Sequence, residues 1–122
     1  MNNFLMVAAG GALGSMARYG VNILAGRLTA LPLGTLAVNV TGCLAMGLLA
    51  AALAHRGGQH LAPLLLTGVL GGYTTFSAFA LDTLTLWDRG AAAMAVGYVL
   101  VSVLVSLAAV TLGLALGRGL FA

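Results

Sequence analysis

The chain has 122 residues, of which 61% are hydrophobic and 6% are charged, and its mean hydropathy is +1.11. Soluble domains carry about 25% charged residues, so this composition excludes an ordinary soluble protein and predicts an integral membrane protein. One helix needs about 20 apolar residues to cross the hydrocarbon core, so the length allows four spans and no folded domain outside the membrane. We therefore expect a single all-α transmembrane domain over residues 1–122.

The apolar runs place the four predicted spans in chain order. The first covers residues 4–25; because no basic segment precedes it and it continues past signal-peptide length, we expect it to be retained as a helix. The second covers residues 33–54, the third 63–87 and the fourth 91–116. Each of these runs is long enough to cross a bilayer with some tilt.

The middle of the third span predicts a broken helix. Gly71 and Gly72 are followed closely by Thr74 and Thr75, and both paired glycines and β-branched residues weaken helical preference. Within a bilayer, unwound backbone persists only where it faces protein, a water-filled cavity or an ion. The sequence therefore predicts a functional site near the centre of this span.

The arginines outside the spans are evenly divided between the two membrane sides. Arg27 and Arg89 fall on one side, Arg56 and Arg118 fall on the other, and Arg18 shifts the balance slightly. Positive charge in short loops sets the orientation of a membrane protein, so the loop charges of this chain favour neither orientation strongly. The chain is also too small to enclose a pore alone. We expect an antiparallel, dual-topology homodimer. The alternative, in which the first helix selects one orientation, stays open.

Polar residues recur inside three of the spans. Asn39 carries an amide that needs a partner in lipid, and both a ligand role and an interhelical hydrogen bond are open for it. Tyr98, Ser102 and Ser106 share one helical face at spacings of four, as a polar track or as a packing surface. Arg18 either attracts anions to the mouth of a path or extends to the membrane interface.

Two phenylalanines follow the predicted break. Phe76 and Phe79 are three residues apart, on one helical face, with Thr75 and Ser77 beside them. Aromatic rings have positive edges, so such a pair beside hydroxyl donors can coordinate a small desolvated anion, although a phenylalanine pair also serves simple packing. Asp82 is the single acidic residue well inside a span, where it accepts a hydrogen bond or titrates.

Other chemistries find little support in the sequence. Cys43 is the single cysteine, which excludes an intrachain disulfide and predicts a small packing residue. No nucleophile stands with a base and an orienting group, and His55 and His60 fall in a polar loop, so we expect no enzyme. Five separated arginines form no basic patch for nucleic acid.

Three motifs in chain order resemble those of the Fluc fluoride channels, often labelled CrcB. They are GGALGSMARY at residues 10–19, GTLAVNVTG at 34–42 and GVLGGYTTFSAF at 68–79. With the four spans, the resemblance covers essentially the whole chain. It implies a passive fluoride channel that relieves a bacterial cell of toxic fluoride across its inner membrane. It also implies an antiparallel homodimer with two pores, surrounded by lipid, and a structural sodium ion at the dimer centre.

The resemblance also implies roles for particular residues. The fluoride pore would be lined by Asn39, Phe76, Phe79, Thr75, Ser77, Tyr98, Ser102 and Ser106. Arg18 would lie at the aqueous vestibule, and the backbone carbonyls of Gly71 and Thr74 would hold the sodium ion. Two departures stand out: Ala78 replaces a hydroxyl residue of the TTFSTF pattern, and Asp82 replaces the usual glutamate.

Other membrane functions remain as alternatives. A proton-coupled small-ion carrier could use Asp82, and transport driven uphill by a pH gradient would reveal it. A small-multidrug-type exporter also has four short helices, but it needs a carboxylate in its first helix, which this sequence lacks. A non-transporting assembly subunit would explain the glycines and leave the phenylalanine, asparagine and hydroxyl residues without a role.

Overall fold

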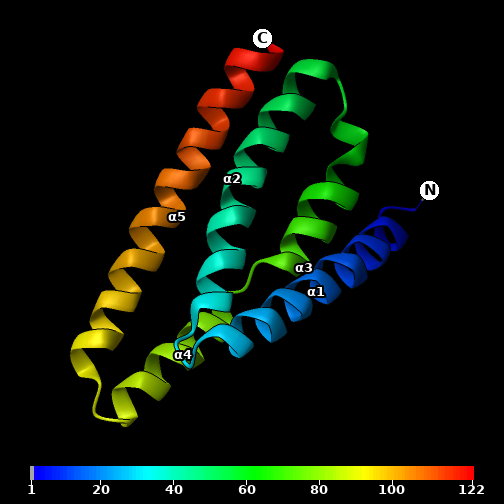
Figure 1. Ribbon diagram of the computed structural model, residues 1–122. Coiled ribbons are helices and arrows are strands. Elements are labelled where there is room, and N and C mark those ends of the chain that lie inside the picture. Colours follow the sequence, from blue (N-terminus) through cyan, green and yellow to red (C-terminus); the bar gives the residue numbers. More distant parts are fainter. Residues whose placement is uncertain (1) are drawn as a thin grey trace.

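The computed structural model describes residues 2–122, and every regular element in that part of the chain is a helix (Figure 1). Helix α1 (Asn3–Leu28) leads to α2 (Leu33–Arg56), which a left-handed Gly57 (φ 69°) terminates, and the last helix is α5 (Ala92–Phe121). Between α2 and α5 lie four shorter elements: the 3-10 turn η1 (Gln59–Leu61), the π-helix η2 (Pro63–Leu70), α3 (Gly71–Tyr73) and α4 (Phe76–Asp88).

Among residues 2–122, four segments are long and apolar enough to cross a membrane: Asn3–Leu28, Leu33–Arg56, Gln59–Asp88 and Ala92–Phe121. The prediction of an all-α chain with four spans is thus confirmed at the level of length and composition, and no strand occurs in this part of the chain. The helices extend a few residues beyond the predicted spans, because their ends carry polar residues that hydropathy alone excludes.

Two pairs of parallel helical segments build the molecule. Helices α2 and α5 run side by side in the same direction, and α1 packs along η2 and α3 (Figure 1). Glycines allow both contacts: a Cβ on Gly47 would lie 2.6 Å from the backbone nitrogen of Leu114, and one on Gly10 would lie 2.9 Å from that of Val69. Such close backbone contact is the usual way that membrane helices gain packing energy.

The third candidate span contains bends. Pro63 occupies its first turn, where its missing N–H costs no helical hydrogen bond. Further along, Thr74 (φ −87°, ψ 158°) and Thr75 (φ −154°, ψ 125°) are extended, and α4 starts at Phe76. Two extended residues therefore separate α3 from α4 near the middle of the span.

The extended residues occupy only the second half of the stretch, residues 71–75, over which the sequence predicted a break. Gly71 and Gly72 stay helical, and the extended residues are the threonines that follow. Gly72 has a packing role instead, because a Cβ there would lie 2.6 Å from the carbonyl oxygen of Gly11 on α1. Gly72 thus fixes α3 against α1, and the extended residues follow directly after α3.

Candidate functional site

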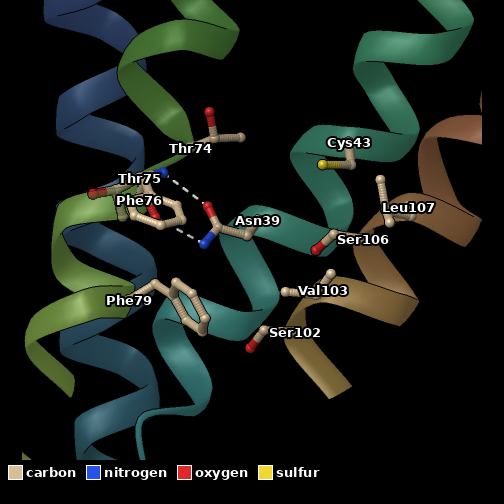
Figure 2. A pocket seen from close by; sticks show the side chains of 10 residues that line it. All are labelled: Asn39, Cys43, Thr74, Thr75, Phe76, Phe79, Ser102, Val103, Ser106 and Leu107. Atoms are coloured by element: carbon tan, nitrogen blue, oxygen red, sulfur yellow. Dashed lines mark hydrogen bonds between the residues drawn. The ribbon is translucent and has the colours of Figure 1, made fainter. Parts of the chain in front are cut away.

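A side-chain amide on α2 holds the extended segment. The Nδ2 of Asn39 donates to the carbonyl oxygen of Thr75 at 2.9 Å, and its Oδ1 accepts from the Thr75 N–H at 2.7 Å (Figure 2). The Thr75 N–H, which has no helical acceptor here, is thereby satisfied, and the Thr75 carbonyl gains a side-chain donor. The interhelical bond left open by the sequence is thus present, and one Nδ2 hydrogen stays free for another acceptor.

Threonine hydroxyls complete the ends of the flanking helices. Thr75 is the N-cap of α4, and its Oγ1 accepts from the Ala78 N–H at 3.2 Å and lies 3.3 Å from the Ser77 Oγ. Thr74 donates through both its backbone N–H (3.0 Å) and its Oγ1 (2.9 Å) to the carbonyl oxygen of Leu70. The interruption therefore has few unsatisfied donors, as apolar surroundings require.

Two carbonyl oxygens lose their helical donors in this arrangement. The Thr75 N–H, which would serve Gly71 in a continuous helix, donates to Asn39, and the Ala78 N–H, which would serve Thr74, donates to the Thr75 hydroxyl. Uncharged backbone oxygens of this kind suit a hard cation such as sodium. Across residues 2–122, no cluster of three His, Cys, Asp or Glu side chains could hold a metal.

A pocket of about 280 Å³ opens beside the extended segment, between α4, α2 and α5 (Figure 2). It gathers residues from all three helices: Asn39, Cys43, Thr74, Thr75, Phe76, Phe79, Ser102, Val103, Ser106 and Leu107. Six of the eight predicted pore residues are therefore brought together. The other two, Ser77 and Tyr98, do not line this pocket; Ser77 is exposed beside Thr75, and Tyr98 lies behind Phe79.

The two phenylalanines differ sharply in burial. Phe79 is 8% exposed and Phe76 is 77% exposed. Their ring centroids are 5.5 Å apart with planes at 66°, an edge-to-face arrangement, and the Phe79 ring lies 5.4 Å from that of Tyr98. The Phe79 side chain is thus buried, whereas Phe76 forms the outer rim of the pocket.

Ser102 presents an unpaired hydroxyl on the pocket wall. Its residue is 5% exposed, and among residues 2–122 its Oγ has no hydrogen-bond partner. Buried hydroxyls are nearly always hydrogen-bonded in native proteins, and an exception needs an explanation. A ligand in the pocket would supply that partner.

Asp82 and Tyr98 form a hydrogen bond behind Phe79. The Tyr98 hydroxyl donates to the Asp82 Oδ2 at 3.2 Å, which agrees with the expectation that this carboxylate accepts a hydrogen bond. Asp82 also borders a polar pocket of about 440 Å³ near the α1–α2 connection, with Asn22 and Thr35 on its wall. The carboxylate therefore lies between this polar pocket and the rear of the phenylalanine pair.

Arg18 lies apart from the pocket between α2, α4 and α5. Its Nε donates to the carbonyl oxygen of Gly72 at 3.1 Å, and its side chain is half-buried. The guanidinium thus links α1 to the last turn before the extended residues, which a side chain extended wholly to the interface would not do. Its vestibule role stays a prediction.

Cys43 also lines the pocket, although it was not among the predicted pore residues. It was expected to be a packing residue, but it lies on the pocket wall one helical turn beyond Asn39 (Figure 2). The signal was present in the sequence, because residues four apart share a helical face.

Comparison with known proteins supplies the family. A family model described as "CrcB-like protein, Camphor Resistance (CrcB)" matches residues 5–114. A protein of Paracoccus denitrificans named "Fluoride-specific ion channel FluC" is 77% identical over 122 residues, covering 99% of this chain and 98% of that one. Relatives of the same name from Cereibacter sphaeroides (51% identical; 98% and 97% covered) and Agrobacterium fabrum (49% identical; 99% and 100% covered) are also similar. These matches confirm the resemblance carried by the three motifs.

Proposed function

The chain belongs to the CrcB-like family, and from that premise we propose that it is a fluoride-selective ion channel of a bacterial inner membrane. The relatives' shared name supports the choice of ion. The observation that carries the proposal in this chain is the buried, unpaired Ser102 hydroxyl in a pocket that also holds Asn39 and the phenylalanine pair.

The pocket offers the kind of coordination that a small, strongly hydrated anion requires. Selectivity depends on replacing the ion's water shell with closely placed protein donors. Ser102 and Ser106 supply hydroxyls, Asn39 has one free N–H, and the edges of Phe76 and Phe79 are positive. None of these groups carries a full charge, so fluoride would be bound weakly enough to leave again, as passive flow requires.

The interrupted span gives the path a favourable field. We propose that residues 59–88 form one spanning helix, broken at Thr74 and Thr75, whose second part, α4, begins beside the pocket. The N-terminal end of a helix carries a partial positive charge and free N–H groups. Fluoride passing Phe76 would therefore be stabilised without a fixed cation.

We further propose an antiparallel homodimer with two such paths and a sodium ion at its centre. An axis in the membrane plane brings the middle of the interrupted span against its inverted copy, so the Gly71 and Thr74 carbonyls of both chains would hold the ion. Both carbonyls lack their helical donors, and Gly71 is exposed, which supports this assignment. Bound there, sodium would neutralise facing carbonyl dipoles and fasten the two chains together.

Ion flux from liposomes tests the proposed function. Purified protein is reconstituted in vesicles loaded with fluoride or chloride, and efflux is followed with ion-selective electrodes. We expect rapid fluoride efflux and negligible chloride efflux; equal rates for both ions, or no fluoride flux, would refute the proposal. Phe76→Ile and Phe79→Ile should each suppress flux, whereas Leu104→Ile, at a side chain 63% exposed on α5, should not.

A proton-coupled small-ion carrier is the second candidate, because Asp82 lies inside a span and bonds to Tyr98. The two functions differ in their energetics. A pH gradient imposed across the vesicle should drive fluoride against its own gradient if the protein is a carrier, and Asp82→Asn should abolish that uphill movement. A channel gives no uphill movement in either protein.

A further inference from the structure

We propose that Cys43 lines the fluoride path and that its thiol is a covalent modification site at which a small thiol reagent closes that path. The inference rests on the proposed function for its flux readout, but the accessibility of the thiol is tested separately.

Two rows of polar side chains face the same pocket from different helices. On α2, Asn39 and Cys43 are four residues apart, and on α5, Ser102 and Ser106 have the same spacing. Because α2 and α5 run parallel and in close contact, the rows run in the same direction along the pocket. Figure 2 shows Cys43 beyond Asn39 and Ser106 beyond Ser102 on the respective helices. Cys43 thus extends the α2 row by one turn.

A second, independent observation on this pocket favours a ligand. The Oγ of Ser102 is buried and lacks a partner among residues 2–122. An ion that satisfies this hydroxyl occupies the space that the Cys43 side chain also borders. To continue past Ser106, it must pass the thiol.

The thiol is accessible enough to react. Cys43 is half-buried and unbonded to another cysteine, and the pocket of about 280 Å³ has room for several waters at about 30 Å³ each. A reagent of similar size to a few waters can therefore enter. Once attached, its added atoms remain between Cys43 and Ser106 and obstruct the path.

Methyl methanethiosulfonate is a suitable reagent. The Cys43 thiolate attacks the reagent's divalent sulfur, so that a new S–S bond forms to the methylthio group. The bond from that sulfur to the sulfonyl sulfur breaks, methanesulfinate leaves with the electron pair, and the thiol proton passes to the buffer. Dithiothreitol reverses the reaction by reducing the mixed disulfide.

The experiment uses the full chain in liposomes, where the single cysteine makes the adduct unambiguous. Intact mass measures labelling, and fluoride efflux is compared with the untreated rate of the same protein. We expect one adduct per chain, a loss of efflux of at least about tenfold as expected for an obstructed filter, and recovery with dithiothreitol. Treated Cys43→Ser should keep its own untreated rate. In Cys43→Ser with Gln59→Cys, at an exposed position in the polar segment after α2, the new thiol should label without loss of flux, because a thiol in contact with water ionises and reacts.

Each outcome decides the inference. A labelled wild-type protein that conducts at its untreated rate would show that Cys43 lies off the path. A folded protein that does not label, while the SDS-denatured chain does, would show that the pocket does not admit the reagent. If the untreated protein carries no fluoride while Cys43 still labels, the proposed function fails and the thiol's accessibility stands.

Discussion

Replacing Asn39 with leucine, an apolar side chain of similar size, should free the extended segment from α2. Both bonds to Thr75 (2.7 and 2.9 Å) would be lost, and an unsatisfied buried group costs about 1–3 kcal/mol, so two groups cost about 2–6 kcal/mol. Side-chain hydrogen bonds within membranes measure lower, at about 0.6 kcal/mol on average. Asn39 and Thr75 are half-buried, so we expect a loss near the low end, about 2 kcal/mol.

Two measurements detect this loss. Reversible unfolding in mixed detergent micelles, followed by far-ultraviolet circular dichroism, gives the change in the free energy of unfolding. Amide hydrogen exchange at Thr75 gives the local effect, and 2 kcal/mol corresponds to exchange faster by about 30-fold. The exchange measurement is the more specific of the two, because the Thr75 N–H donates directly to Asn39.

A matched control separates this effect from general sensitivity to polar substitution. The hydroxyl of Thr111 donates to Leu107 of its own helix at 2.8 Å and is exposed, so Thr111→Val should change stability by less than about 0.5 kcal/mol. If Asn39→Leu is as stable as Thr111→Val and its Thr75 amide exchanges no faster than in the wild type, the Asn39 amide does not hold the extended segment.

Four further substitutions test other contacts by the same unfolding assay, two of them by fluoride efflux as well. Gly72→Ala should destabilise the protein by about 1–3 kcal/mol through overpacking, because its Cβ would lie 2.6 Å from the Gly11 carbonyl oxygen. As a control, Gly11→Ala should be neutral, because a Cβ there meets no atom within 4 Å. Equal effects of the two substitutions would contradict this packing. Phe79→Ala should lower the free energy of unfolding by about 1–2 kcal/mol, because packing is lost and detergent replaces part of it. Phe76→Ala, at 77% exposed, should cost little, yet both should reduce fluoride efflux; a stable, fully conducting pair would remove the phenylalanines from the path. Arg18→Met should lower the free energy of unfolding by about 1 kcal/mol, because it removes the hydrogen bond to the Gly72 carbonyl. Arg18→Lys keeps the charge but lacks the Nε–H. If it is as unstable as Arg18→Met, the lost stability comes from the hydrogen bond and not from the charge.

Hydropathy was sufficient to predict the four spans, because a segment that crosses lipid must be both apolar and helical. Hydropathy could not predict which residues of the third span would be extended. Gly71 and Gly72 suggested unwinding by their low helix propensity, but both are helical, and the missing side chain of Gly72 serves the contact with α1 instead. The extended Thr75 is held by Asn39, 36 residues earlier in the chain, which bonds both of its backbone groups. Helix propensity depends on residues close in sequence, so it cannot predict a hydrogen bond from a residue as distant as Asn39.

The candidate site shows the same division. Helical spacing placed Ser102 and Ser106 correctly on one wall, because both lie on a single uninterrupted helix. Tyr98 shares their face in sequence, but its hydroxyl turns to Asp82 and its ring to Phe79, so it lies outside the pocket. That choice depends on how α4 packs against α5, which no local pattern encodes.

The close contact between α2 and α5 has a consequence for how the passage behaves on warming. Gly47 and Gly113 bring the two backbones together, and a Cβ on Gly113 would lie 3.0 Å from the backbone nitrogen of Leu48. Contacts between side chains loosen as rotamers redistribute, but a contact made by backbone atoms has no rotamers to populate. We therefore expect the α2 row and the α5 row to keep their distance on warming better than either keeps its distance from the shorter α4, whose Phe76 and Phe79 form the opposite wall. A change in fluoride flux with temperature should then reflect motion of α4 more than separation of α2 from α5.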